Sequence, residues 1–218
     1  MRRQVSMDEI SDGRLYGLND MVKADCQGCD SCSACCRGMG ESVVLTPLDL
    51  YRLETGLGCS FGELLVDRIE LNLADGLILP NLKMKRENEA CVFLNQSGRC
   101  SVHGMRPDIC RLFPLGRFYE EDGFRYFLQV HECAKKNRMK VKVKKWLDIP
   151  DLARHETFIQ DWHDYRKETG EALDADGREE TRREVTMRIL KLFYIRPYEK
   201  ERDFYEQFYE RLEEAKGL

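Results

Sequence analysis

Half of the cysteines in this chain are packed into one short segment. The chain has 218 residues and ten cysteines, and the run CQGCDSCSACC carries Cys26, Cys29, Cys32, Cys35 and Cys36. Thiolates at three-residue spacing are typical ligands of a soft metal ion or an iron–sulfur cluster. The spacing therefore predicts that a metal site is the functional centre.

Disulfide bonds are the alternative use of so many cysteines. The other five are spread more widely: Cys59, Cys91, Cys100, Cys110 and Cys133. The N-terminal segment MRRQVSMDEISDGR has no apolar stretch of the kind a secretory signal needs, so export is not expected. Small disulfide scaffolds have a cysteine density of about 8–10%, which is higher than here, and a longer chain can bury a core without cross-links. Metal or cluster ligation is therefore favoured over a disulfide framework.

Composition indicates an ordinary globular protein. Hydrophobic residues make up 42% of the chain, charged residues 34%, and the net charge is -4. No segment approaches the roughly 20 apolar residues that a membrane-spanning helix needs. We therefore expect a cytoplasmic protein that has no membrane partner.

One segment departs from this acidic balance. Residues 135–145 contain seven basic side chains and no acidic one. Such a run is either a solvated face or a surface for a protein partner or another acidic partner, including a nucleic-acid backbone.

The sequence divides into three parts. Residues 1–22 are polar and are expected to form a loosely held N-terminal arm. Residues 23–145 hold all ten cysteines and are expected to form a cysteine-cluster, metal-binding domain. Residues 146–218 contain no cysteine and show helical periodicity, which predicts a helical extension packed on that domain.

Local signals place the first regular elements. Residues 42–46 suit a short strand because they are rich in β-branched side chains. Thr46 and Pro47 are typical of a helix start, and Gly56 is expected to end that helix. Ser60 and Glu63 form a capping box that predicts a second helix.

Two hairpins are expected in the second half of the cysteine-cluster domain. The first turns at residues 95–98, and a turn centred between Gln96 and Ser97 would place Cys100 opposite Phe93. Cys91 and Cys100 would then share one face, whereas a one-residue shift would separate them. The second hairpin turns at residues 121–123 and leads to Cys133.

Between the hairpins, the sequence predicts a short helix that carries a thiol. Pro107 suits the first helical position, and Pro114 ends the helix. Cys110 would then lie near the first turn, where the helix dipole is expected to lower its thiol pKa.

The last third is expected to form about three helices. Apolar stripes run through residues 158–165, 185–193 and 204–212. Gly170 with the polar segment after it, and then Arg196-Pro197, are expected to separate them, with the last helix beginning at about Tyr198. His155 and His163 are interpreted as structural. The fold class predicted from all these elements is α+β: a small cysteine-rich domain with two hairpins and short helices, followed by the helical extension.

Three motifs in order resemble a known family. The CxxCxxCC run, the segment CVFLNQSGRC and the segment RPDICRLFP together are similar to the YkgJ-type CxxCxxCC cysteine-cluster proteins, a zinc- or iron-chelating domain family. The resemblance spans about residues 23–135. It implies as metal ligands Cys29, Cys32, Cys35, Cys36, Cys91, Cys100, Cys110 and Cys133. Flagellin lysine methylases contain a related cysteine cluster, so the resemblance also associates this chain with methyl-transfer reactions.

Eight candidate thiolates exceed the four ligands of one tetrahedral zinc. Either two metal sites or one cluster with spare thiols is implied, and the ligand type and number favour an iron–sulfur cluster over zinc. Arg37, Arg106 and Arg111 flank the cysteines and are candidates for offsetting the negative charge of the cofactor. The roles of Cys26, Cys59, His103 and His131 stay open.

The sequence supports two functional hypotheses. In the first, the centre is redox-active or assists a protein-modification reaction such as methyl transfer. In the second, structural zinc stabilises a module that binds a protein or a nucleic acid. Motifs for nucleotide binding or hydrolysis are missing from the sequence, so an enzymatic role would have to run through the metal centre.

Overall fold

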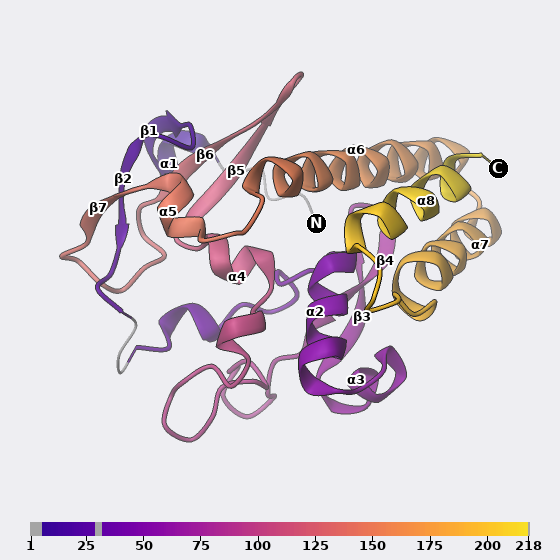
Figure 1. Cartoon of the computed structure of the whole chain (residues 1–218), viewed down its shortest axis with the longest axis horizontal. Coiled ribbons are helices and arrows are strands. Elements are labelled where there is room, and N and C mark those ends of the chain that lie inside the picture. Colours follow the sequence, from indigo (N-terminus) through magenta and orange to yellow (C-terminus); the bar gives the residue numbers. More distant parts are fainter. Residues whose placement is uncertain (1–5, 29–31, 218) are drawn as a thin grey trace.

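Small antiparallel sheets and a region of longer helices make up the fold (Figure 1). The computed structural model describes residues 6–28 and 32–217, so Cys29 lies outside the described residues. Within them, the predicted α+β class is confirmed.

The strands form three separate antiparallel sheets. The largest has the order β1–β6–β5, and the other two are the pairs β2–β7 and β3–β4. Their bounds are β1 Ser11–Tyr16, β2 Met21–Asp25, β3 Ile69–Ala74, β4 Leu77–Leu82, β5 Leu115–Glu120, β6 Gly123–Gln129 and β7 Met139–Lys142. The hairpin β5–β6 turns at Glu121 and Asp122, where the sequence predicts it.

The N-terminal segment differs from the expected loosely held arm. A short helix, α1 (Met7–Ile10), leads into β1, whose Leu15 and Tyr16 pair with Phe127 and Tyr126 of β6. The pairing partner lies more than 100 residues away, so the local polar composition gives no sign of it. β2 then leads directly into the cysteine run.

Two capped helices follow the cysteine run. Thr46 and Asp49 form a capping box at the start of α2 (Pro47–Leu57), and Ser60 and Glu63 form the predicted one at the start of α3 (Phe61–Asp67). The first helix ends at Gly58, which adopts φ +65°, and not at Gly56 as predicted. Gly56 instead lets the helix approach Met105, because a Cβ there would meet the Met105 Sδ.

Two predicted elements near these helices are different in the structure. Residues 42–46 form only an isolated bridge between Val44 and Asn81, instead of a strand. The segment after α3, from Ile69, forms strand β3 of the hairpin β3–β4, which the local sequence signals do not predict.

The described C-terminal region contains a long helix, three shorter helices and a π-helical turn. The elements are α5 (Val143–Leu147), α6 (Leu152–Asp176), α7 (Glu179–Leu190), the π-helix η3 (Lys191–Ile195) and α8 (Phe204–Lys216). The last helix begins six residues later than predicted. Among the described residues, no helix combines the length and the apolar character required to span a membrane.

Gly170 lies inside α6 and does not end it. A Cβ at this position would come within 2.2 Å of the backbone oxygen of Asp75, in the β3–β4 turn. Arg182 of α7 donates a hydrogen bond to the carbonyl of Gly76 in the same turn. Gly170 therefore permits the close contact between α6 and this hairpin, a role that a helix-breaking signal in the sequence does not reveal.

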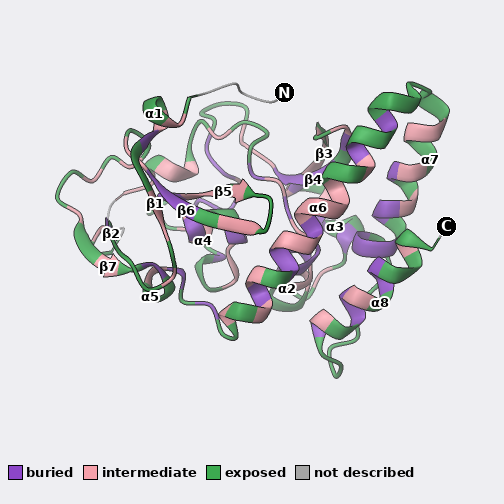
Figure 2. Cartoon of the chain, turned by 90° about the horizontal axis from the view of Figure 1, so that it is seen from above, coloured by how far each residue is buried: buried purple, intermediate pink, exposed green. Residues whose placement is uncertain are grey.

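Two hydrophobic clusters fill the interior. The larger one joins α2, α3 and the β3–β4 hairpin to α6, η3 and α8, and buries Trp162, Phe193 and Phe208. Figure 2 shows buried residues along one side of α6. The smaller cluster lies against β2, β6 and α5. Helix α4 (Asp108–Leu112) touches both, because Leu112 belongs to the smaller cluster and Cys110 packs against the larger one.

We predict that Gly170→Ala destabilises the protein by about 1–3 kcal/mol, although alanine is the better helix former, because the added methyl group collides with backbone that cannot move aside. Gly62→Ala is the matched control: this exposed glycine of α3 has open space around its Cβ position, so stability should rise by up to about 1 kcal/mol. Urea unfolding of both variants measures the difference. A Gly170→Ala variant as stable as Gly62→Ala would contradict the packing described above.

Candidate metal centre

The end of the cysteine run is joined to Cys91 through backbone hydrogen bonds. Residues 34–36 form a 3-10 turn, η1 (Ala34–Cys36). The Cys91 N–H donates to the Cys36 carbonyl at 2.8 Å, and the Gly38 N–H donates to the Glu89 carbonyl at 2.9 Å. Arg37 and Ala90 form an isolated antiparallel bridge between these contacts. Two segments more than 50 residues apart are thereby held side by side.

The loop between Cys91 and Cys100 is tighter than the hairpin predicted for it. Leu94, not Phe93, lies opposite Cys100, which is a one-residue shift from the expected register. The Asn95 side chain accepts a hydrogen bond from the Arg99 N–H and shapes the turn. Because only single bridges form, strict alternation of faces does not apply. Burial raises the pKa of Cys91, and the Cys100 thiol lies close enough to add to this effect.

Cys110 is on the short helix α4, as the sequence predicts, and Pro107 is its N-cap residue. The expected pKa direction was wrong. Burial raises the pKa of Cys110, and negative charge on Cys91 and Asp49 adds to the effect. A helix of five residues has too small a dipole to outweigh the loss of water around the thiol.

The adjacent cysteines Cys35 and Cys36 contact each other. The Cys35 thiol donates a hydrogen bond to the Cys36 sulfur, which raises the pKa of Cys35 and lowers that of Cys36. In an extended strand neighbouring side chains would point apart, but the 3-10 turn brings them together. Cys36 is therefore the more readily ionised thiol of this pair.

Five sulfurs from three segments form one neighbourhood. Each influences the pKa of at least one of the others, and they belong to Cys35, Cys36, Cys91, Cys100 and Cys110. Within residues 6–28 and 32–217, however, no three His, Cys, Asp or Glu side chains are arranged as a ready-made metal site. Thiols lose their protons and close around a metal as it binds. Because sulfur is a soft donor, this set of neighbouring thiols fits a zinc ion or an iron–sulfur cluster.

Two other described cysteines, Cys32 and Cys133, are half-buried. Cys59 lies at the start of α3, where burial raises its pKa and its charged neighbours are Arg68, Glu63, Glu54 and Asp67. It is not part of the group of five.

The three flanking arginines differ in what they contact. Arg106 carries a positive charge that partly offsets the raised pKa values of Cys35 and Cys100, and its guanidinium contacts His103. Arg111 donates to the carbonyls of Gly104 and Asp148. Arg37 is exposed and donates to the Ser33 hydroxyl at 3.2 Å. Of these three arginines, Arg106 is the one whose charge acts on the pKa of the cysteines. His131 is exposed.

A buried ionic network lies beside the sulfurs, and the sequence reasoning missed it. The Asp108 carboxylate contacts Arg117 Nη2 of β5 and His155 Nε2 of α6, both at 2.7 Å. Burial alone would raise the pKa of Asp108, but Arg117 and His155 outweigh it and hold the pKa below its usual range. His155 has 1% of its side chain exposed. Its position between Arg154 and Glu156 gave no sequence signal of a buried partner.

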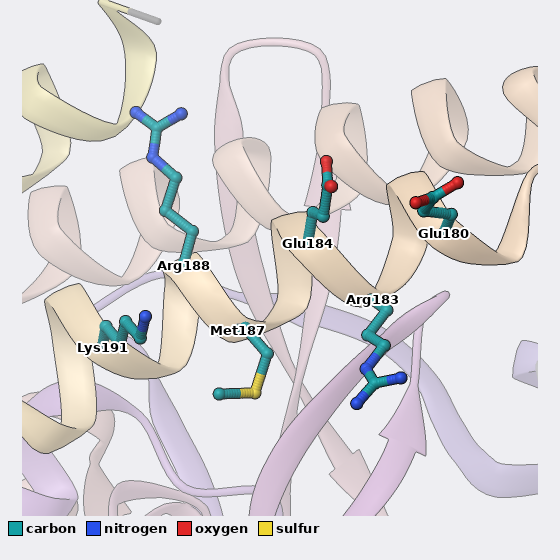
Figure 3. Close-up of a pocket in the computed structure, with 6 residues that line it drawn as sticks. All are labelled: Glu180, Arg183, Glu184, Met187, Arg188 and Lys191. Carbon is teal, nitrogen blue, oxygen red and sulfur yellow. The ribbon is translucent and has the colours of Figure 1, made fainter.

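Two surface features lie apart from the sulfurs. Most of the basic run is exposed: Lys136 precedes β7, Lys140 and Lys142 are on β7, and Lys144 and Lys145 are on α5. A shallow hollow runs along α7, where Figure 3 shows Met187 between charged side chains. No cysteine lines that hollow, and it is not part of the metal centre.

Comparison with known families agrees with the donor set. The CxxCxxCC family, described as "Putative zinc- or iron-chelating domain", matches residues 28–138, just over half of the chain. The chain belongs to this family. No curated protein and no solved structure gave a match. The CxxCxxCC domain therefore includes all five neighbouring sulfurs, whereas α6, with His155, follows it.

We predict that Cys100→Ser lowers the metal content of the CxxCxxCC protein several-fold, because a hydroxyl is a poor ligand for soft metals. Cys59→Ser is the matched control and should keep the wild-type metal content, since Cys59 lies outside the group of five. Metal analysis of the purified proteins measures both. Equal loss in the two variants would show that the grouping of sulfurs is wrong.

Proposed function

We propose that this protein holds an iron–sulfur cluster, or alternatively zinc, through its clustered cysteines. The observation that supports the proposal is the convergence of five thiols from three segments. Cys29, Cys32 and Cys133, the remaining thiols implied by the family resemblance, are proposed as further ligands. Iron–sulfur clusters are bound by cysteine thiolates, and a cluster accommodates more sulfurs than one zinc ion does.

The chemistry of the site favours a buried centre with charge compensation. Cys91 belongs to the larger hydrophobic cluster, and Cys36, Cys100 and Cys110 pack against it, so little water reaches Cys91 and Cys110. Four thiolates around a metal leave net negative charge, and we propose that Arg106 offsets it, with Arg37 and Arg111 nearby in the sequence. A buried cluster of this kind supplies electron transfer, or a reactive centre for a protein modification such as methyl transfer.

We predict that protein purified without oxygen contains iron and acid-labile sulfide and has a broad visible absorbance, which is bleached by a reductant and recovers on reoxidation. Metal analysis, sulfide analysis and absorption spectroscopy test this. Colourless protein with stoichiometric zinc would contradict the iron–sulfur assignment and leave structural zinc as the cofactor. Protein that takes up neither metal would contradict the proposal as a whole.

A second candidate function is supported by the basic run. Five exposed lysines without an acidic residue among them present a positive surface on β7, on α5 and on the segment before β7. Under this alternative, zinc stabilises the fold and the lysines bind an acidic partner, a protein surface or a nucleic-acid backbone. Binding of this kind weakens steeply as salt increases, which distinguishes it from a solvated face.

A further inference from the structure

Helix α4, which carries Cys110, is too short to fix its own orientation. It spans five residues, Asp108–Leu112, and isolated helices shorter than about 12 residues are marginal in water. The direction in which Cys110 points must therefore be set by contacts from other parts of the chain.

Neighbouring elements hold both ends of α4 through its backbone. At the N-terminus, the Asp108 N–H donates to Asp49 Oδ1 of α2 at 2.8 Å. At the other end, Trp146 Nε1 of α5 donates to the Leu112 carbonyl at 3.1 Å. Figure 1 shows α4 at the centre of the molecule, between β5 and α2.

The Asp108 side chain supplies the third anchor. Its two oxygens are divided between Arg117 Nη2 and His155 Nε2, each at 2.7 Å. A carboxylate only accepts hydrogen bonds, so the His155 Nε2 carries the proton and its Nδ1 faces the Tyr205 hydroxyl at 3.4 Å. All three side chains are enclosed, with 10% or less of each exposed.

We propose that His155 is a positioning residue of the metal centre: from α6, beyond the region matched by the family, it fixes Asp108 and thereby the helix that presents Cys110 to the other sulfurs. This inference rests on the proposed function, because it assigns part of that site to the helical region. The chain segment after residue 138 then contributes, through His155, to the positioning of a thiol of the centre.

The network is better suited to fixing geometry than to adding stability. Burying an ion pair costs much of what the pair returns, so apolar residues in its place would stabilise the fold about as well. A buried network of hydrogen-bonded charges instead favours one arrangement of the elements it joins. Here those elements are α4, β5 and α6, and Cys110 is two residues from the shared carboxylate.

The test compares His155→Phe, which removes the donor, with His155→Gln, which keeps an N–H near the Nε2 position. Metal affinity is measured by competition with a chelator, using the metal found in the wild-type protein. In parallel, alkylation of Cys110 and Cys91 by iodoacetamide is followed by mass spectrometry in metal-free protein. We expect His155→Phe to lose about 10-fold or more in affinity and to alkylate faster at Cys110 than at Cys91, and His155→Gln to recover most of both.

Phe193→Leu is the matched control for lost stability, because Phe193 is buried in the same helical region and its ring contacts Trp162 and Phe208 and not Asp108. It should lower the melting temperature while keeping affinity within about twofold. Affinity that follows melting temperature equally in both variants, with unchanged Cys110 alkylation, would overturn the inference. If His155→Phe does not fold, Asp108→Asn replaces it in the same comparison. Wild-type protein without metal would refute the proposed function alone, and Cys110 alkylation would then decide the positioning role.

Discussion

The backbone hydrogen bond from the Cys91 N–H to the Cys36 carbonyl is the contact on which the arrangement of the site depends. It aligns the end of the cysteine run with the segment that precedes the Cys91–Cys100 loop, and the Arg37–Ala90 bridge extends the alignment. Because Cys91 is buried, leaving its N–H unpaired would be costly. The end of the cysteine run is thus held against the hydrophobic interior at one defined register.

The site also needs the Cys110 thiol, which is supplied by a different segment of the chain. Helix α4 lies where the two hydrophobic clusters meet, and it is held by Asp49, Arg117, His155 and Trp146. These four side chains come from α2, β5, α6 and α5, so the position of one thiol depends on most of the chain. The helical region and the cysteine-rich region share the larger cluster, which couples their packing to the site.

The sequence was informative where a local signal coincides with a local structure. The helix start at Thr46, the capping box at Ser60, the β5–β6 hairpin and the short helix of Cys110 follow from neighbouring residues. The errors concern partners far away in the chain. The pairing of β1 with β6 and the approach of Gly170 to Asp75 depend on tertiary contacts that no window of sequence contains. The buried role of His155 was missed for the same reason, and burial reversed the expected pKa shift of Cys110.

X-ray absorption at the metal edge of the loaded protein tests the central claim, that these thiols surround one centre, most directly. The account predicts a first shell made of sulfur, at about 2.3 Å for zinc or iron, with four or nearly four sulfur neighbours per metal. A first shell made mainly of nitrogen and oxygen at about 2.0–2.2 Å would contradict it.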